Sequence, residues 1–443
     1  MTGLIVLSLF ISHFRPCFAQ DYARMTERSI TGTARYIGMG GAMSAIGGDP
    51  SAAHDNPAGL GLYRRAEMLL TLDYSLDRTH QIGGTEYWNR HTFTVPQASL
   101  VLSFSRDKLT DEGVQFNNLL FSYKRLHSYN RHLSGSTASE GQSLGALLGD
   151  LDVNWDIPFC TEPRNNGYDI LLDETGSVDE FVADWSMNIS NRVFIGAGIQ
   201  VLSYTLSAKS DYKETFNFRN EQREVRYNQN LSSLVLSGAA CNLSAGVIWR
   251  PVGWLRLGMG LRTPSLGSLN TYTNGELWAR TDSLRVSYAG DARSSDDRFH
   301  QPMHLSLSTA FQIGAYGMIA LQYDYRGAKY MDDIHSLRAG LEVIPVMGMY
   351  INAGYVYEST FKNRDLSVAV DPTFTRQDTY FMQSKSTQYA SVAIGYRGAY
   401  TIVQAAYQYR WQRINFYAHE NAKPFDMRAD THRIVLTIGW HRY

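Results

Sequence analysis

The chain has 443 residues, with 41 Lys+Arg against 42 Asp+Glu and a mean hydropathy of -0.28. A near-neutral balance gives no basic surface, which argues against a nucleic-acid partner. The slightly polar mean hydropathy argues against a helical membrane protein, whose sequence would be far more apolar. The contents of 28 Tyr and 37 Gly agree with a β-rich protein.

The N-terminus has the features of an export signal. An apolar stretch runs from Leu4 to Phe14, and Cys17, Phe18 and Ala19 form a plausible cleavage region before Gln20. The stretch lacks a Lys or Arg in front of it, but we still predict a signal peptide at residues 1–19. A lipid anchor on Cys17 is less favoured, because small residues do not follow it.

Cleavage would leave two cysteines, Cys160 and Cys241. We place Cys160 in a long loop and Cys241 at an apolar, lipid-facing position. A disulfide between two such positions is not expected, although an exported protein meets an oxidising compartment.

Residues 20–65 do not alternate and are dense in Gly and Ala. Asp49 and Pro50 suit the start of a short helix, and Asn56-Pro57 would end it. The glycines are not followed by Lys-Ser/Thr and no strand precedes them, which argues against a phosphate loop. A compact segment of small residues in front of a barrel predicts a plug, or hatch, inside the lumen.

From residue 66 onward the chain repeats a period of two. Ile319, Leu321 and Tyr323 alternate with Gln322 and Asp324, which predicts strands with one apolar and one polar face. Fourteen segments follow this pattern: 66–77, 94–106, 115–127, 179–189, 192–208, 226–250, 253–264, 301–313, 316–327, 335–344, 347–358, 386–397, 399–412 and 431–443.

The connections alternate between tight turns and long polar loops, the largest at 128–178 and 265–300. Short turns on one side, long loops on the other and an even strand number are typical of outer-membrane barrels. We therefore predict an all-β fold: a 14-stranded antiparallel transmembrane β-barrel at 66–443, with the hatch at 20–65 and both termini in the periplasm. A soluble barrel or a propeller is the alternative, but the chain shows no blade-length repeat.

The hatch segment also resembles a known family. The stretch Ala34–Leu62, with Gly-Gly-Ala at 40–42 and Asn-Pro-Ala-Gly at 56–59, is similar to the hatch of the FadL/TodX outer-membrane transporters of long-chain fatty acids and aromatic hydrocarbons. Residues 257–264 and 301–307 resemble later strands of that family, which also has fourteen strands.

The resemblance implies a passive channel in which a hydrophobic ligand enters from the loops and leaves sideways through the wall when the hatch shifts. Asn56, Pro57 and Ala58 match the hatch motif, and either gating or a purely structural helix break would explain them. The family's lateral opening comes from an inward kink in the third strand. Phe116–His127, the predicted third strand, has no Gly or Pro to mark such a kink.

Two sets of residues are candidates for ligand contact. Leucines in the largest loop recur at helical spacing and offer a landing groove, or simply pack against other loops. They are Leu144, Leu147, Leu148 and Leu151. Of the inward-facing charges, Arg262 and Arg338 could hold a carboxylate head group. The alternative for these arginines is a salt-bridge network that fills the wet interior.

The sequence supports no catalytic or metal site. Gly141–Gly145 matches a nucleophile-elbow pattern around Ser143, but no buried strand precedes it. The histidines, His54 and His304 included, have no ligand spacing, so we expect neither metal nor cofactor, and no enzyme.

The leading hypothesis is a monomeric outer-membrane transporter for a fatty acid or similar hydrophobic small molecule, surrounded by outer-membrane lipid. The alternative is an accessory barrel of a secretion system, like the family relatives PorV and PorQ, which acts through protein partners.

Overall fold

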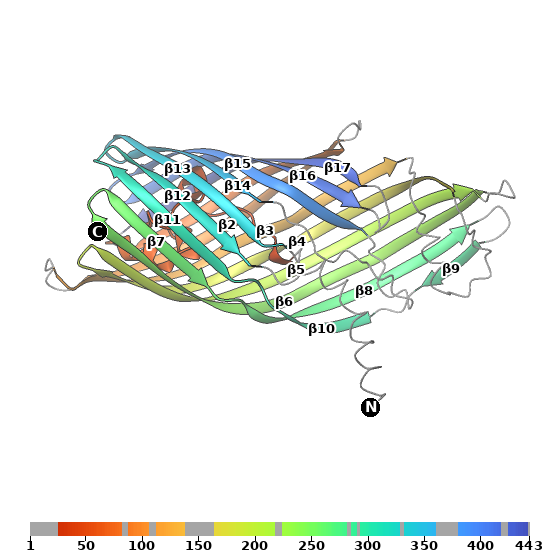
Figure 1. Ribbon diagram of the computed structural model, residues 1–443, viewed down its shortest axis with the longest axis horizontal. Helices are drawn as coiled ribbons and strands as arrows, with labels where there is room; N and C mark the ends of the chain where they lie inside the picture. The colour runs from red at the N-terminus through yellow and green to blue at the C-terminus, as the bar shows by residue number, and fades with distance from the viewer. Residues whose placement is uncertain are drawn as a thin grey trace, which may run out of the picture.

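The computed structural model describes residues 25–81, 87–105, 112–137, 164–217, 224–280, 285–289, 293–327, 332–359, 380–417 and 424–441. All fourteen predicted segments are confirmed as strands of one closed antiparallel barrel (Figure 1). They are β1 (Glu67–Gln81), β2 (Tyr87–Ser105), β3 (Val114–Thr137), β4 (Arg164–Ile189), β5 (Val193–Asn217), β6 (Glu224–Val252), β7 (Leu255–Arg262), β11 (His304–Ile313), β12 (Gly317–Arg326), β13 (Ile334–Val346), β14 (Met349–Glu358), β15 (Phe381–Arg397), β16 (Thr401–Tyr417) and β17 (Phe425–His441).

The barrel closes between its first and last strands. β1 pairs with β17 from Glu67↔His441 to Gln81↔Met427, so no edge is left at this junction. Each strand of the ring pairs with its neighbour in sequence, except that β7 pairs with β11. Closure satisfies the backbone groups that lipid cannot, as a membrane-spanning sheet requires.

The two largest predicted loops are shorter than 128–178 and 265–300. β3 continues to Thr137 and β4 already begins at Arg164. The range 265–300 contains β8 (Leu266–Arg280), β9 (Arg285–Ala289) and β10 (Arg293–Phe299), and β8 extends the pairing of β7 with β6. The alternation weakens in these polar extensions, because they no longer have one face in lipid.

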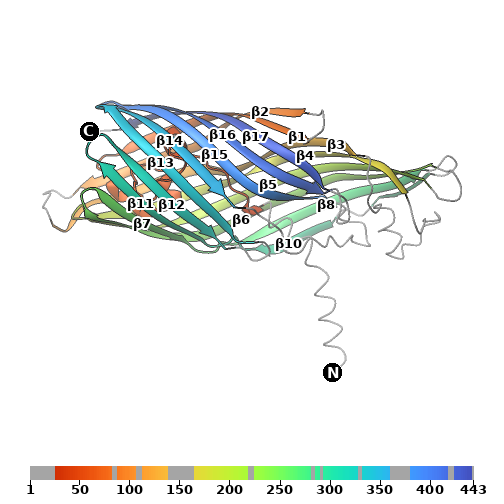
Figure 2. The ribbon, with the colours of Figure 1, turned by 45° about the horizontal axis from the view of Figure 1, so that its top comes forward.

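The long strands give the barrel a lopsided shape. β4, β5, β6 and β8 extend well past β11 to β14 at one end, which we call the far end (Figures 1 and 2). The opposite end carries the short turns, and the hatch lies inside the barrel toward it; we call it the hatch end. None of the described helices is long and apolar enough to cross a membrane.

Burial along the strands is inverted relative to a soluble protein. On β16, Val403 faces outward with 47% exposure, whereas its neighbour Gln404 faces the lumen with 2%. Apolar residues cover the outer wall all around the barrel, and Cys241 is exposed among them as predicted. An apolar outside and a polar, filled inside match lipid outside the barrel.

A belt of tyrosines marks one border of the apolar wall. Three outward tyrosine hydroxyls bond histidine Nδ1 atoms on neighbouring strands, at 2.7, 2.7 and 2.8 Å. The pairs are Tyr74–His91, Tyr323–His335 and Tyr407–His432. Aromatic side chains with a polar tip suit the level of the lipid head groups.

The hatch folds as short helical pieces. It contains α3 (Ala34–Gly38), η1 (Ala52–His54) and η2 (Pro57–Leu62). Thr33 caps α3 by accepting from the Tyr36 amide, and Asn56 caps η2 by accepting from the Ala58 amide. Pro57 occupies the first turn of η2, where a missing N–H costs nothing.

Candidate functional site

The predicted hatch motif is the point where the hatch docks on the wall. The side-chain amide of Asn56 donates to the carbonyls of Ser44, at 3.0 Å, and Val247, at 3.2 Å. A Cβ atom at Gly246 would lie 2.0 Å from Oδ1 of Asn56, so this strand position needs glycine. One at Gly196 would lie 2.5 Å from the Pro57 carbonyl carbon. Glycines in the wall therefore form the seat for the motif.

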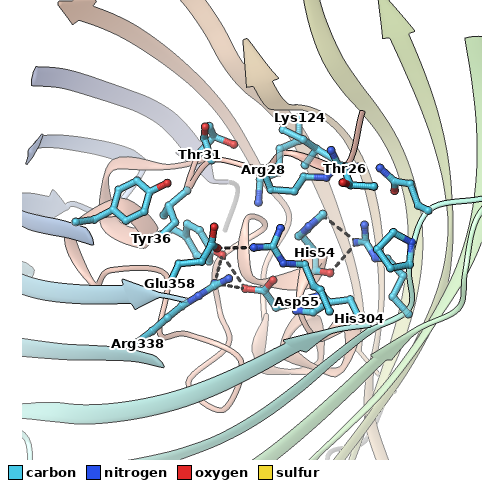
Figure 3. A pocket seen from close by; sticks show the side chains of 18 residues that line it. Thr26, Arg28, Thr31, Tyr36, His54, Asp55, Lys124, His304, Arg338 and Glu358 are labelled. Carbon is cyan, nitrogen blue, oxygen red and sulfur yellow. Dashed lines mark hydrogen bonds and ion pairs between the residues drawn. The ribbon is translucent and has the colours of Figure 1, made fainter. Parts of the chain in front are cut away.

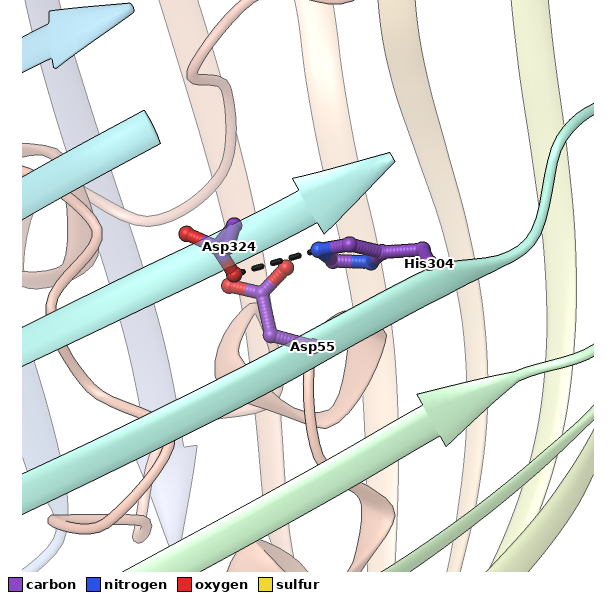
Figure 4. Close-up of side chains that lie close together, drawn as sticks. All are labelled: Asp55, His304 and Asp324. Carbon is purple, nitrogen blue, oxygen red and sulfur yellow. Dashed lines mark hydrogen bonds and ion pairs between the residues drawn. The ribbon is translucent and has the colours of Figure 1, made fainter. Parts of the chain in front are cut away.

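A buried ion network joins the hatch to the opposite wall. Arg338 on β13 lies 3.0 Å from Oδ2 of Asp55 and 2.8 Å from Oδ2 of Asp324. Tyr36 donates to Asp55 at 2.7 Å, and His304 Nε2 lies 3.1 Å from Asp324 (Figures 3 and 4). Both carboxylates are 1% exposed. Arg338 is thus fully engaged in a salt-bridge network.

Asp55, His304 and Asp324 also place three possible metal-ligand atoms within 4.8 Å of one another. A cation there would compete with the guanidinium of Arg338, which already neutralises both carboxylates. The geometry fits an ion-pair network better than a metal centre.

Arg262 makes the second half of the network. Its guanidinium donates to Glu180 at 2.5 Å and to the backbone carbonyl of His54 at 2.7 Å. His54 Nδ1 lies 2.6 Å from the same Glu180 carboxylate. Burial, followed by the field of Arg262, lowers the pKa of His54 below its ordinary value, so the ring is neutral in the docked hatch.

The pKa of Asp55 moves in the direction that keeps it charged. Burial alone would raise this pKa, but the charge of Arg338 holds it below its ordinary value. The pKa of Tyr36 is raised by burial and then by Asp55, so its hydroxyl stays a donor. The docked hatch therefore presents a neutral imidazole and an ionised carboxylate side by side.

A small polar cavity lies between the hatch and the wall (Figure 3). Its volume is about 70 Å³. Two of its cations have no carboxylate partner within the described residues. Arg28 donates to the carbonyls of Met25 and Glu27, and Lys124 to that of Ser51. Backbone carbonyls, rather than a carboxylate at ion-pair distance, therefore hold these two cations.

An apolar cluster lines the lumen on the far side of the hatch. Its members are Met25, which lies before the hatch helices in the chain, and residues of β3 to β6, β8, β10 and β13. They are Met25, Leu126, Tyr129, Val178, Leu202, Tyr204, Leu206, Ala208, Leu234, Leu236, Ala240, Leu269, Phe299 and Ile334, all at most 6% exposed. Met25 of the N-terminal segment is packed among residues of the wall. We call this set the lumenal apolar cluster.

Among the described strands, β2 and β3 are joined by an incomplete ladder, which we call the seam. β2 and β3 pair from Ser105↔Phe116 to Gln97↔Lys124 and no further, although both strands continue toward the far end within the described residues. Pro96, which cannot donate to a ladder, stands where the pairing stops and opposite a register shift in β1. Beyond it only side chains connect the two strands, with Asn130 donating to Thr92.

The third strand does deviate, although it lacks the Gly or Pro that we took as the signal. A β-bulge lies between Arg125 and His127, where β3 leaves β2 and stays paired to β4. Bulges bend a strand and re-aim its side chains. The signal lay in the neighbouring strand, at Pro96.

The other predicted site residues have mixed outcomes. Leu144, Leu147, Leu148 and Leu151 lie outside the described residues. Arg262 and Arg338 lie in a salt-bridge network in the lumen, and their contact with a ligand stays a prediction. Sequence reasoning missed Arg28, Lys124 and the lumenal apolar cluster, because inward apolar residues of these strands break the expected polar parity.

The architecture defines a class: a transmembrane β-barrel of fourteen strands with an N-terminal hatch docked in its lumen. No family model and no curated protein sequence matches the chain.

Solved structures do match. The chain is similar to a Pseudomonas aeruginosa FadL homologue, at 12% identity and a TM-score of 0.59, covering 93% of this chain and 99% of that one. It is similar to the P. putida toluene transporter TodX, at 13% identity and a TM-score of 0.51, covering 94% and 99%. The CymD monoaromatic hydrocarbon channel matches at 11% identity and a TM-score of 0.52, covering 94% and 98%. The chain therefore has the FadL/TodX fold, as the hatch motif indicated.

Proposed function

We propose that this chain is a monomeric outer-membrane channel that passes hydrophobic compounds, with long-chain fatty acids as the favoured ligands, and that both termini lie in the periplasm. The observation that carries the proposal is the lumenal apolar cluster. Fourteen apolar side chains gather there inside the barrel, although most inward positions of the strands are polar, and such a cluster suits contact with an apolar chain. Each methylene group buried there contributes about 0.8 kcal/mol.

The docked hatch closes this route. A cavity of about 70 Å³ is far smaller than the ~300–1,000 Å³ of an ordinary ligand pocket. Passage then requires that Met25 leave the cluster and that the hatch shift on its seat. In this proposal Asn56, Pro57 and Ala58 act as the gate contact.

Two cations favour a carboxylate over a neutral hydrocarbon. Arg28 and Lys124 line the cavity next to the cluster and lack carboxylate partners among the described residues. A fatty acid would place its chain in the cluster and its head group against them, in a charge-assisted hydrogen bond.

The seam between β2 and β3 would be the lateral exit, because a wall held only by side chains there opens without breaking a ladder. Passive movement of this kind needs neither cofactor nor catalysis. The alternative, an accessory barrel of a secretion system, is less favoured, because the matched structures include a toluene transporter and a monoaromatic hydrocarbon channel.

Ligand binding tests the proposal. The purified barrel in mild detergent is extracted with organic solvent, and bound small molecules are identified by mass spectrometry. Binding of dodecanoic acid is then measured in the wild type, in Leu236→Gln and in Leu236→Met as a matched control that keeps the site apolar. We expect loss of binding in the first variant and little change in the second. Equal binding in all three would refute the assignment of the cluster.

The head-group assignment has its own test. Arg28→Gln and Lys124→Gln are expected to weaken dodecanoic acid binding by about tenfold or more each, since a charge-assisted hydrogen bond contributes about 1.5–3 kcal/mol. Binding of dodecanol, which has the same chain without the charge, should change little. A parallel loss for both ligands would argue against a carboxylate site and for a structural role.

A further inference from the structure

A serine, a histidine and a glutamate meet where the N-terminal segment runs along β3 inside the barrel. The hydroxyl of Ser29 lies 3.0 Å from Nδ1 of His127 on β3. The carboxylate of Glu27 lies 3.6 Å from Nε2 of the same ring. One imidazole is therefore flanked by a hydroxyl at one nitrogen and a carboxylate at the other, as in a Ser-His-acid triad but with the two ring nitrogens exchanged.

A local irregularity of the strand brings the histidine there. On β3, Lys124 and Leu126 face the lumen, so regular alternation would turn residue 127 outward. The bulge between Arg125 and His127 resets the parity, and His127 becomes a lumenal side chain with 4% exposure. A bulge that re-aims a side chain is a frequent feature beside active sites.

The surroundings suit an acyl substrate. Leu126 and Tyr129, on either side of His127 in the chain, both belong to the lumenal apolar cluster. Ser29 lines the same cavity as the cations Arg28 and Lys124, and His127 lines a second cavity that reaches the seam. An acyl chain in the cluster would thus place its carbonyl group between the serine and positive charge.

We propose that Ser29, His127 and Glu27 form a hydrolytic site for acyl esters inside the barrel, with Ser29 and His127 as catalytic residues and Glu27 as a positioning residue. The inference goes beyond transport, although it uses the apolar cluster of the proposed function. Its product, a free fatty acid, is the ligand that the cations of the cavity would hold.

The chemistry runs through an acyl-serine. Ser29 Oγ attacks the ester carbonyl carbon while its proton passes to Nδ1 of His127. The bond to the alcohol oxygen breaks, and the alcohol leaves with that proton. Water then gives a proton to Nδ1, attacks the acyl-serine carbon and releases the carboxylic acid, while the proton returns to Ser29. Glu27 accepts from Nε2–H and stabilises the imidazolium; such contacts are often long before substrate binds.

Covalent labelling gives the direct test. The full-length barrel in detergent is treated with a fluorophosphonate probe, and its peptides are mapped by mass spectrometry. Hydrolysis of p-nitrophenyl decanoate is measured in parallel for the wild type, Ser29→Ala and His127→Gln, where Gln keeps a hydrogen-bonding side chain so that the segment still docks. Ser336→Ala, at a buried lumenal serine that bonds no histidine, is the matched control.

The expected result is probe mass on Ser29 and a loss of hydrolysis of at least ~100-fold in both site variants, with the control unchanged. Glu27→Gln should lower kcat and shift its pH profile with little change in KM, which a merely structural contact would not do. An unlabelled Ser29 in the folded wild type, with hydrolysis that does not depend on Ser29, would overturn the proposal. Dodecanoic acid binding by the same preparation reports on the transport function separately.

Discussion

Replacing Arg338 by methionine should loosen the hatch and leave the barrel intact. Arg338 is the cation shared by two buried carboxylates, Asp55 in the hatch and Asp324 in the wall, at 3.0 and 2.8 Å. Methionine fills a similar length of side chain without the charge. Both carboxylates would then lie in the lumen with 1% exposure and no guanidinium between them.

The size of the effect follows from this geometry. Removing one partner of a buried ion pair costs about 3–5 kcal/mol, because it leaves an uncompensated charge. The change that lowers this free energy most readily is a movement of the hatch that brings Asp55 into water, because Asp324 is fixed in a strand. Asp55→Asn should cost less, about 1.5–3 kcal/mol, because Arg338 keeps Asp324 as a partner.

A buried reporter in the hatch measures this cost. Ser44 is 1% exposed and its hydroxyl bonds nothing among the described residues. In a background with the native cysteines changed to serine, Ser44→Cys should react with a maleimide about 10²- to 10⁴-fold faster when Arg338→Met is added. The β-sheet circular dichroism should stay unchanged. An unchanged labelling rate would mean that the network does not hold the hatch, and a lost β-sheet signal would mean that it holds the barrel instead.

Three further outcomes follow from the hatch seat, its titration and the seam. Gly246→Ala places a Cβ atom 2.0 Å from the hatch and should weaken docking by about 1–3 kcal/mol in the same labelling assay, whereas Gly253→Ala, with its nearest atom at 3.9 Å, should have no effect. The pKa of His54 is lowered in the docked state, so His54 of the undocked hatch takes up a proton first as the pH falls below about 6.5, and protonation favours the undocked hatch. Channel openings in planar bilayers should therefore become more frequent between about pH 6.5 and 5. The variant His54→Asn should abolish this pH dependence. A disulfide between Thr92→Cys and Asn130→Cys should close the seam and block fatty-acid uptake reversibly, without changing hatch labelling; uptake that ignores the bridge would exclude the seam as the exit.

The barrel could be predicted from the sequence because successive side chains of a strand alternate between lipid and the lumen, so that apolar and polar residues alternate with a period of two. Val403 outside and Gln404 inside differ by one residue, and a slip by one would put every such pair on the wrong side of the wall. The alternation therefore fixed the strands to within a few residues over most of the wall. The alternation did not predict the extensions at the far end, which have no face in lipid. There β3 continues beyond residue 128 to Thr137, and β4 begins at Arg164, before residue 178.

The candidate site was largely invisible to the same reasoning. Ser29 and His127 are 98 residues apart in the chain, and the bulge that aims His127 inward leaves no signature in composition. Pro96 is evident in the sequence, but the end of the β2–β3 ladder beside it could be predicted only with the strand pairing known. Arg262 and Arg338 could be placed in the lumen because they lie on strands with regular alternation, whereas their partners in the hatch lie in a segment without such a period.

The balance of forces explains how a hatch can move inside a rigid wall. Adjacent strands are held by continuous ladders whose groups lipid cannot satisfy, so opening a ladder there is costly. The hatch is held by apolar contacts such as those of Ile37 and Leu60 with the wall, by ion pairs such as Arg338–Asp55 and by the hydrogen bonds of Asn56. Buried ion pairs gain little net free energy once desolvation is counted, so water that enters with a ligand can replace them at small cost. A ligand that brings its own carboxylate to Arg28 and Lys124 would add the bias that shifts the hatch from docked to displaced.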